Sequence, residues 1–355
     1  MPQINHRMIQ LARESRGMSQ TDLSKKTRIP QPQLSRIEGG SMPDIEARII
    51  KTLSEELNYP ESFFTQDYKV YPPNIHYRKR ETIDQKSLLR ADALMNIYRF
   101  NIQELLKVVE LSNQNVPRIK EQYESPEQVA QSLRQYWRVQ TGPIDKLSEL
   151  LEEQGIIIVP IEFETDKIEG RSVVADTGHA IIFVNKNSSG DRQRLTIVHE
   201  VAHIIMHINS IPTFGRDEEK EAFDFAIEFL MPYHEVKHQF KGRITLEKLA
   251  QLKTVWKVSM QAILKRLQSL NVVDYNQARY LWSQFNAQNI RKKEPVYVAP
   301  EKPVLIKQMI DLYLKANEYS KNDLVTTFRI PLSEIEERYF DEQSNPFLRI
   351  NKDRQ

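Results

Sequence analysis

The stretch IVHEVAHIIMH at residues 197–207 constrains the fold of this chain more than any other. It is apolar except for one glutamate and three histidines, and it is too long for an ordinary strand. On a helix, residues four apart share one face, so His199 and His203 project together and can meet one metal ion. Glu200 is displaced by about 100° and sits beside that ion, where a carboxylate can accept a proton from water. The alternative is a buried helix with two incidental histidines, because such short patterns recur by chance.

Composition limits the available metal ligands and compartments. The chain of 355 residues contains no cysteine, so any metal must be held by histidine and carboxylate groups. The same absence fits a reducing cytosol. No apolar run approaches the length of about eighteen residues that suggests a membrane span, and the N-terminus lacks an apolar signal core. We therefore expect a cytoplasmic protein without a membrane segment.

Hydrophobic periodicity separates helical segments from a short stretch of β-branched residues. Apolar residues at helical spacing predict helices before and after this stretch. Thr177-Gly178 divides two of the β-branched segments and predicts a hairpin turn. Besides the histidine helix, the predicted helices are 86–111, 126–138, 217–230, 245–270 and short helices within 303–340, and the predicted strands are 155–163, 171–176 and 179–185.

These segments predict a multidomain, mainly α chain. An all-α N-terminal domain is expected at 1–66, and a linker with a helical segment at 67–140. An α+β domain with a small sheet is expected at 141–240, and a helical C-terminal region at 241–355. A Pro-Pro pair without clear periodicity marks the linker within 67–80.

A third metal ligand is expected on the helix that follows the histidines. It reads DEEKEAFDFAIEFLMP over 217–232, and its apolar residues recur at helical spacing. Glu219 shares the apolar face, Glu221 lies at its edge, and Glu218 remains open as an alternative. A carboxylate on a buried face needs a charge partner, which a metal would supply. An acidic first turn stabilised by the helix dipole is the competing explanation.

The segments DRQRLTIVHEVAHIIMH and EKEAFDFAIEFLMP together resemble the ImmA/IrrE family of metallopeptidases over about residues 155–235. The resemblance implies a gluzincin-type domain with a catalytic zinc ion (Zn2+). It implies His199 and His203 as zinc ligands, Glu219 as the third ligand and Glu200 as the general base. Phe223 departs from the family pattern, which usually has Asn or Asp there, and the neighbouring Asp224 is out of register by one residue.

Four more polar residues lie near the two motifs. His207 lies eight residues after His199, and we expect it near the negative end of the helix dipole rather than on the metal. A donor to the developing oxyanion would come from Tyr233, His234 or His238, among which the sequence does not select.

The N-terminal segment SQTDLSKKTRIPQPQLSRIEGG, residues 19–40, predicts a short helical hairpin. Ser19 suits an N-cap, with Asp22 three residues on as in a capping box. The second helix offers side chains that can pair with base edges in a major groove. Residues 1–43 hold seven Lys and Arg against three acidic residues, a net charge of +4. A polar hairpin without a DNA role is the alternative. The offered side chains are Gln31, Gln33, Ser35 and Arg36.

Residues 5–64 are similar to the Xre/Cro-like helix-turn-helix class. The similarity implies binding of double-stranded DNA as a homodimer on a two-fold symmetric site. By this similarity Gln20 contacts the DNA backbone, while the second helix approaches the bases. Pro32 replaces a residue that often touches DNA.

Two later segments echo the spacing of this hairpin. SKNDLVTTFRIPLSEIEERY at 320–339 places Glu334, Glu336 and Glu337 where DNA would lie, and acidic groups repel phosphate. We therefore expect a hairpin used for packing or dimerisation there. Residues 246–273 show a similar rhythm, and their apolar stripe is expected to be core.

Together these features predict a DNA-binding transcriptional regulator with a zinc-dependent endopeptidase domain. The resemblance implies cleavage of a repressor-like protein, either another helix-turn-helix protein or this chain itself. One alternative is a non-proteolytic regulator whose peptidase-like domain senses a ligand or partner. Another is an antitoxin-type or phage-related DNA-binding protein in which that domain is a binding platform.

Overall fold

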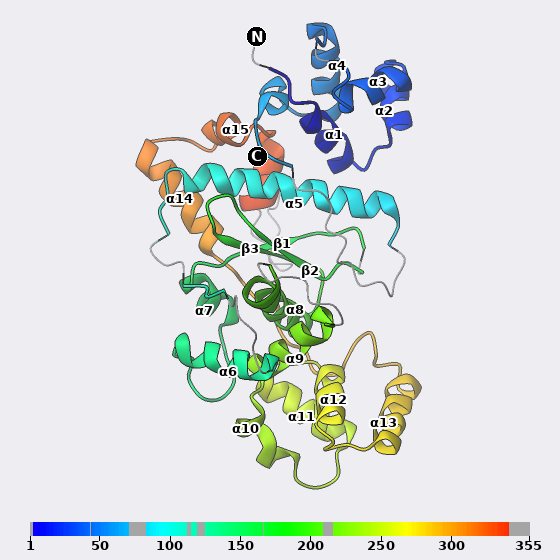
Figure 1. Ribbon diagram of the computed structural model, residues 1–355, viewed down its shortest axis with the longest axis vertical. Coiled ribbons are helices and arrows are strands. Elements are labelled where there is room, and N and C mark those ends of the chain that lie inside the picture. Colours follow the sequence, from blue (N-terminus) through cyan, green and yellow to red (C-terminus); the bar gives the residue numbers. More distant parts are fainter. Residues whose placement is uncertain are drawn as a thin grey trace, which may run out of the picture. The chain divides into compact units, whose positions relative to one another are not determined.

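The computed structural model describes residues 3–42, 44–70, 83–111, 115–118, 125–165, 167–208 and 216–340. It contains two compact units, whose elements are drawn in Figure 1. Unit 1 combines residues 1–110 with residues 305–355, and unit 2 consists of residues 111–304. The chain therefore leaves unit 1, builds unit 2 and returns to unit 1. Within the described ranges, no helix is both long and apolar enough to cross a lipid bilayer.

The bounds of the two units differ from those of the segments expected from the sequence. The predicted C-terminal region, 241–355, divides between the units after residue 304. The long helix of the predicted segment 67–140, α5 (Gln85–Leu106), belongs to unit 1. Most of the predicted linker at 67–80 lies outside the described residues, and the bounds of the four segments remain predictions.

Unit 1 begins with a helix-turn-helix arrangement that follows the sequence signals. As predicted, the Ser19 side chain accepts the Asp22 amide proton at 3.1 Å, and Asp22 accepts the Ser19 amide proton at 3.0 Å. Arg28 then adopts a left-handed conformation (φ 60°) and Ile29 turns inward, which separates the two helices. The helices of unit 1 are α1 (His6–Ser15), α2 (Gln20–Thr27), α3 (Gln31–Glu38), α4 (Ala47–Leu57), a 3-10 helix (Glu61–Thr65), α5, α14 (Leu305–Asn317), α15 (Asp323–Phe328), α16 (Leu332–Ile335) and a π-helical turn (Glu336–Phe340).

The echo at 320–339 is a repeat of this backbone geometry. The Ser320 amide and hydroxyl both donate to the Asp323 carboxylate at 2.7 Å. Arg329 is left-handed (φ 54°) like Arg28, and the following Ile330 is fully buried. The same sequence spacing therefore produces the same turn twice.

The acidic side of this repeat packs inside unit 1. The Glu334 side chain is 10% exposed and pairs with Arg16, the C-cap of α1, at 2.5 Å and with Arg338. Asn101 of α5 donates a hydrogen bond to the Tyr339 hydroxyl at 2.9 Å. Glu334 therefore takes part in packing, as predicted for this hairpin, whereas Glu336 and Glu337 are exposed.

Unit 2 surrounds a three-stranded sheet with helices. The central strand β3 (Ala180–Asn185) pairs in parallel with β1 (Ile157–Ile161) and antiparallel with β2 (Gly170–Val174). The predicted turn joins β2 to β3, where the Gly178 amide (φ 88°) donates to the Ala175 carbonyl at 2.8 Å. The helices are α6 (Pro126–Tyr136), α7 (Leu147–Glu153), α8 (Gly190–Ala202) with a π-helical turn (His203–His207), α9 (Glu218–Leu230), α10 (Tyr233–Val236), a 3-10 helix (Lys237–Phe240), α11 (Leu246–Trp256), α12 (Met260–Ser269) and α13 (Tyr275–Ala287).

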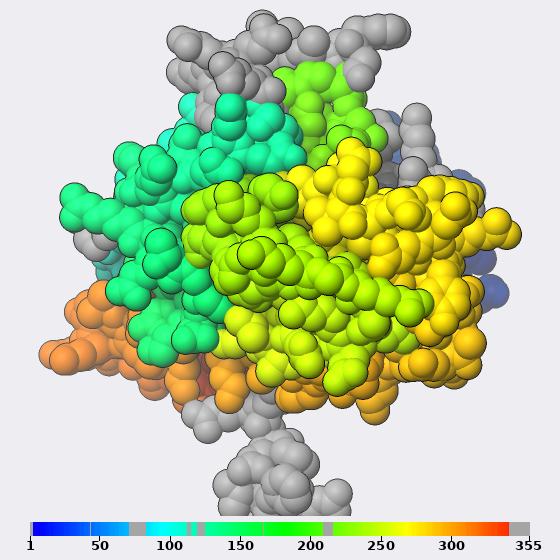
Figure 2. All heavy atoms as spheres, turned by 90° about the horizontal axis from the view of Figure 1, so that it is seen from below, coloured from blue at the N-terminus to red at the C-terminus, as the bar shows by residue number. Residues whose placement is uncertain are grey.

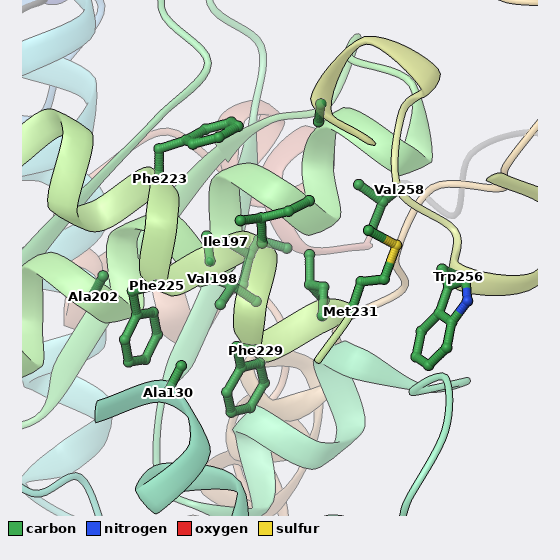
Figure 3. Packing of buried hydrophobic residues seen from close by; sticks show 14 of the residues in the cluster. Ala130, Ile197, Val198, Ala202, Phe223, Phe225, Phe229, Met231, Trp256 and Val258 are labelled. Carbon is green, nitrogen blue, oxygen red and sulfur yellow. The ribbon is translucent and has the colours of Figure 1, made fainter. Parts of the chain in front are cut away.

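The core of unit 2 forms where α9 packs against α6 on one side and α8 on the other. Figure 3 shows Phe225 and Phe229 on the side of α9 that faces Ala130 of α6. Phe223 points the other way, and the Lys265 ammonium lies 3.7 Å from the centre of its ring. In Figure 2, α11, α12 and α13 appear as a continuous yellow-green to yellow surface of unit 2. The predicted core stripe of α11 and α12 is confirmed by burial.

The segment after α13 fixes the start of α8. The backbone of Ala299 approaches Gly190 so closely that a Cβ there would lie 2.0 Å from the Ala299 carbonyl oxygen. The Gly190 amide donates to the Val298 carbonyl at 3.2 Å. Arg194, one turn along α8, pairs with the buried Glu301. The start of the helix that carries the histidines is therefore packed against a segment about 100 residues later in the sequence.

Candidate metal centre and DNA-binding face

The two histidines of the HExxH pattern converge as their spacing predicts. His199 lies in the last turn of α8, and His203 begins the π-helical turn that continues it. Their Nε2 atoms are 3.1 Å apart, and both side chains are less than one-fifth exposed. Two buried imidazole nitrogens therefore face the same point.

Of the three candidate carboxylates on α9, Glu219 faces this point. Its Oε2 lies 3.5 Å from His199 Nε2, and its Oε1 lies 3.5 Å from His203 Nε2. Glu221 instead pairs with Arg216, and Glu218 groups with His203 and His207. The structure thus brings together the predicted set of His199, His203 and Glu219.

This set fits a zinc ion with one open coordination position. Two imidazole nitrogens and a carboxylate are the protein ligands of many catalytic zinc sites. Ligands about 2.0–2.1 Å from a tetrahedral ion lie roughly 3.3 Å from one another. The separations of 3.1 and 3.5 Å between the donor atoms match this requirement.

The charges of the cluster are coupled. Burial acts to raise the pKa of Glu219, but its hydrogen bonds with His199 and His203 outweigh burial and hold the pKa well below the usual range. Burial acts to lower the pKa of His203, yet the contacts with Glu219 and Glu200 raise that pKa on balance. The Glu219 carboxylate is therefore kept ionised, which is the form that binds a cation.

Glu200 lies beside the cluster and is held by a residue that the sequence did not indicate. The Ser172 hydroxyl donates to Glu200 Oε2 at 2.7 Å. Ser172 is in β2, which packs against α8 so closely that a Cβ on Gly170 would lie 2.5 Å from the Thr196 side chain. No local pattern points to Ser172, because it lies 28 residues before Glu200 and is brought near by the sheet.

His207 lies in the last turn of the helix as predicted, but its ring makes specific contacts. Its Nδ1 is 2.9 Å from His203 Nδ1, and its Nε2 is 3.2 Å from Glu221 Oε2. Burial and the neighbouring His203 lower the pKa of His207. The ring of His207 is therefore in contact with the side chains of His203 and Glu221.

The remaining candidates near the two motifs have contacts elsewhere. Tyr233 stacks on Phe240, and His234 lies 3.7 Å from Glu235. Asp224 pairs with Lys220 of its own helix at 3.0 Å. These contacts do not select an oxyanion donor, and they give no support for Asp224 as a replacement at the Phe223 position.

The predicted DNA-binding residues lie on and beside α3. Gln31, Ser35 and Arg36 are exposed, and Gln33 is partly exposed. Gln31 Nε2 donates to Gln20 Oε1 at 2.8 Å.

Gln20 is also tied to the interior of the hairpin. Its Nε2 donates to Glu38 Oε2 at 2.8 Å, and the buried Glu38 pairs with Arg13 at 2.7 Å. The first residues of α2 and α3 are thus joined by hydrogen bonds into one polar surface. This surface combines amide and guanidinium groups that suit phosphate and base contacts.

Two segments of the chain match models of known protein families. Residues 7–70 match a family model described as a helix-turn-helix domain, and residues 151–268 match one described as the IrrE N-terminal-like domain, a peptidase family. A comparison with curated proteins finds no match. The first match indicates DNA binding, and the second indicates a metallopeptidase-like domain. The chain therefore joins an Xre-like helix-turn-helix domain at its N-terminus to a domain of the IrrE/ImmA-like peptidase family at residues 151–268.

Proposed function

We propose that this protein is a DNA-binding transcriptional regulator that cleaves a protein with its zinc-dependent peptidase domain. The substrate class is a helix-turn-helix repressor, either another protein or a copy of this chain. The observation that carries the proposal is the convergence of His199, His203 and Glu219, with Glu200 beside them. The protein would act in the cytoplasm and bind two-fold symmetric DNA as a homodimer.

The proposed chemistry assigns each side chain one task. His199, His203 and Glu219 would hold zinc, which supplies a Lewis acid and lowers the pKa of water. Glu200 would accept the proton of the attacking water and pass it to the leaving amine. Ser172 would keep the Glu200 carboxylate oriented through its 2.7 Å hydrogen bond.

The substrate peptide would lie along β2. Among the strands that the structure describes, β2 is at the edge of the sheet, because the order is β1-β3-β2. An extended peptide can add to such an edge through backbone hydrogen bonds. Ser172 joins this strand to Glu200, so a peptide on the edge would pass near the general base.

Metal analysis beside a cleavage assay tests this proposal. Purified protein should contain one zinc ion per chain and should cleave a repressor-type protein encoded nearby, or itself. Removal of zinc by a chelator should stop cleavage, and added zinc should restore it, because the folded chain brings the three proposed ligands together. Protein that binds zinc but leaves every candidate intact would contradict the proposed protease.

The DNA-binding part makes a separate prediction. Arg36→Ala should weaken binding to the operator by about 1–3 kcal/mol and relax specificity at one base pair, because Arg pairs bidentately with guanine. Arg48→Ala is the matched control, since this α4 side chain is 87% exposed and pairs only weakly with Glu46 at 3.8 Å. Titration of labelled operator variants measures both effects. Unchanged binding by Arg36→Ala would count against α3 as the reading helix.

One observation favours a second candidate, a regulator that does not cut. Phe223 replaces the Asn or Asp usual in the family, and the Lys265 ammonium lies over its ring. Such a domain would sense a ligand or partner through the same fold. Comparison of wild type with Glu200→Gln separates the two candidates.

A further inference from the structure

A chain of polar contacts leads from His203 away from the proposed zinc position to Arg216. His207 Nδ1 lies 2.9 Å from His203 Nδ1, and His207 Nε2 lies 3.2 Å from Glu221 Oε2. Arg216 donates from Nε to Glu221 Oε1 at 3.0 Å and from Nη2 to Glu221 Oε2 at 2.8 Å. The other ring nitrogen of His203, Nε2, faces Glu219. His203 thus has one nitrogen for the metal cluster and one for this chain of contacts.

The backbone brings the two rings together. Residues His203–His207 form a π-helical turn, closed by a hydrogen bond from the Ile208 amide to the His203 carbonyl at 2.9 Å. Such turns are rare and occur frequently at functional sites. The rings of His203 and His207 lie 4.9 Å apart between centroids, and only 4% of the His207 side chain is exposed. The contact is therefore part of the helix structure rather than a surface arrangement.

The contacts of Glu221 determine which ring nitrogens of His207 and His203 carry a proton. The Arg216 guanidinium can only donate, and Glu221 accepts two hydrogen bonds from it, so Glu221 Oε2 acts as an acceptor toward His207 as well. His207 must then carry its proton on Nε2, which leaves its Nδ1 as an acceptor. The 2.9 Å contact next to it requires His203 to carry its proton on Nδ1. In the neutral form that can bind a metal ion, His203 therefore has its lone pair on Nε2, the atom that faces Glu219.

We propose that Arg216, Glu221 and His207 form a positioning relay for the metal ligand His203. The relay, which rests on the proposed zinc site, holds His203 in the tautomer that presents Nε2 to the ion. Hydrogen-bond partners of this kind orient a ligand and raise its basicity, and their loss typically weakens metal affinity about 10- to 100-fold. The relay also gives His207 and Glu221 a task other than metal binding.

The relay and a second metal site exclude each other. His203, His207 and Glu218 lie close enough to hold an ion. With His203 Nε2 on the first ion, a second ion on His203 would need its Nδ1 atom, which the relay already uses in a hydrogen bond to His207. The relay therefore requires a single zinc ion per chain.

Zinc affinity of full-length variants tests the relay. His207→Leu puts an apolar side chain in place of the ring and so removes the acceptor for His203. This variant should bind zinc about 10- to 100-fold more weakly than wild type. His207→Gln should recover part of this loss, because its amide can accept from His203 and donate to Glu221. Glu221→Gln should weaken affinity in the same direction. Lys220→Gln, an α9 side chain that is 71% exposed, is the control and should bind zinc like wild type.

Four measurements make the outcome decisive. Competition with a chromogenic chelator gives the zinc affinity, elemental analysis gives the stoichiometry, and thermal melting of metal-free protein shows whether each variant folds. Selective 15N labelling of histidine in the metal-free protein should show His203 protonated on Nδ1 in wild type and a changed signal in His207→Leu. Wild-type zinc affinity in folded His207→Leu and Glu221→Gln, or two zinc ions per wild-type chain, would overturn the relay. Wild-type protein that binds no zinc would instead overturn the proposed function.

Discussion

Replacement of Glu200 by glutamine is expected to lower kcat/KM for protein cleavage by about 10²- to 10⁴-fold while zinc stays bound. The amide has nearly the same size as the carboxylate, and its oxygen can still accept the Ser172 hydroxyl that now lies 2.7 Å from Glu200. It cannot accept a proton from the attacking water at neutral pH. The three proposed metal ligands are unchanged, so the loss should come from the chemical step rather than from the proposed metal site.

The experiment compares wild type, Glu200→Gln and a charge-matched control loaded with equal zinc. Glu149→Gln is that control, because this α7 side chain is 51% exposed and pairs only with Lys146 at the surface. Cleavage of repressor-type proteins and of the chain itself is followed by gel and mass spectrometry. Equal cleavage by wild type and Glu200→Gln would remove Glu200 from the mechanism. Absence of cleavage by both, with zinc present, would favour the regulator that does not cut.

The ligand set of the candidate site was predictable because it depends on local helical spacing. His199 and His203 are four residues apart, and Glu219 shares a face with the apolar residues of α9. Their positions in the structure follow from these two periodicities once α8 and α9 pack together. Only the choice of Glu219 over Glu218 and Glu221 needed the packed structure.

Other parts of the site depend on contacts that no periodicity encodes. Ser172 reaches Glu200 because β2 lies against α8, and the ring of His207 reaches His203 through a π-helical turn. An unbroken α-helical pattern gives no sign of such a turn. Chain-distant packing and a local backbone irregularity are therefore the two kinds of feature that the sequence left out.

The same distinction holds for the fold. The capped turn of α2 and α3 and the hairpin of β2 and β3 were predicted, because each is set by a few adjacent residues. The return of residues 305–340 to unit 1 was not predicted. Its apolar stripes show that these helices are buried on one face, but a stripe does not specify which partner covers it.

Lys253 makes a further buried contact that the sequence did not indicate. In the sequence it is one more lysine on a helix, whereas in the structure its side chain is 3% exposed between two acidic groups. Its ammonium donates to Asp191 of α8 at 2.9 Å and to Glu294 at 2.7 Å. Glu294 also accepts the backbone amide of Met260 at the start of α12. One cation therefore joins the first turn of the histidine helix to two later parts of unit 2.

Lys253→Met is expected to destabilise unit 2 by about 3–5 kcal/mol, because it leaves two buried carboxylates without their cation. The melting temperature of the corresponding transition should fall by roughly 10 °C. Lys257→Met is the matched control: its partner Asp145 is 84% exposed, so it should cost less than about 1 kcal/mol. Adding Asp191→Asn and Glu294→Gln to Lys253→Met should restore part of the loss, since the two stranded charges are then removed. If Lys253→Met melts like Lys257→Met, or if the added neutral residues restore nothing, the buried charge triad does not hold α8 in place.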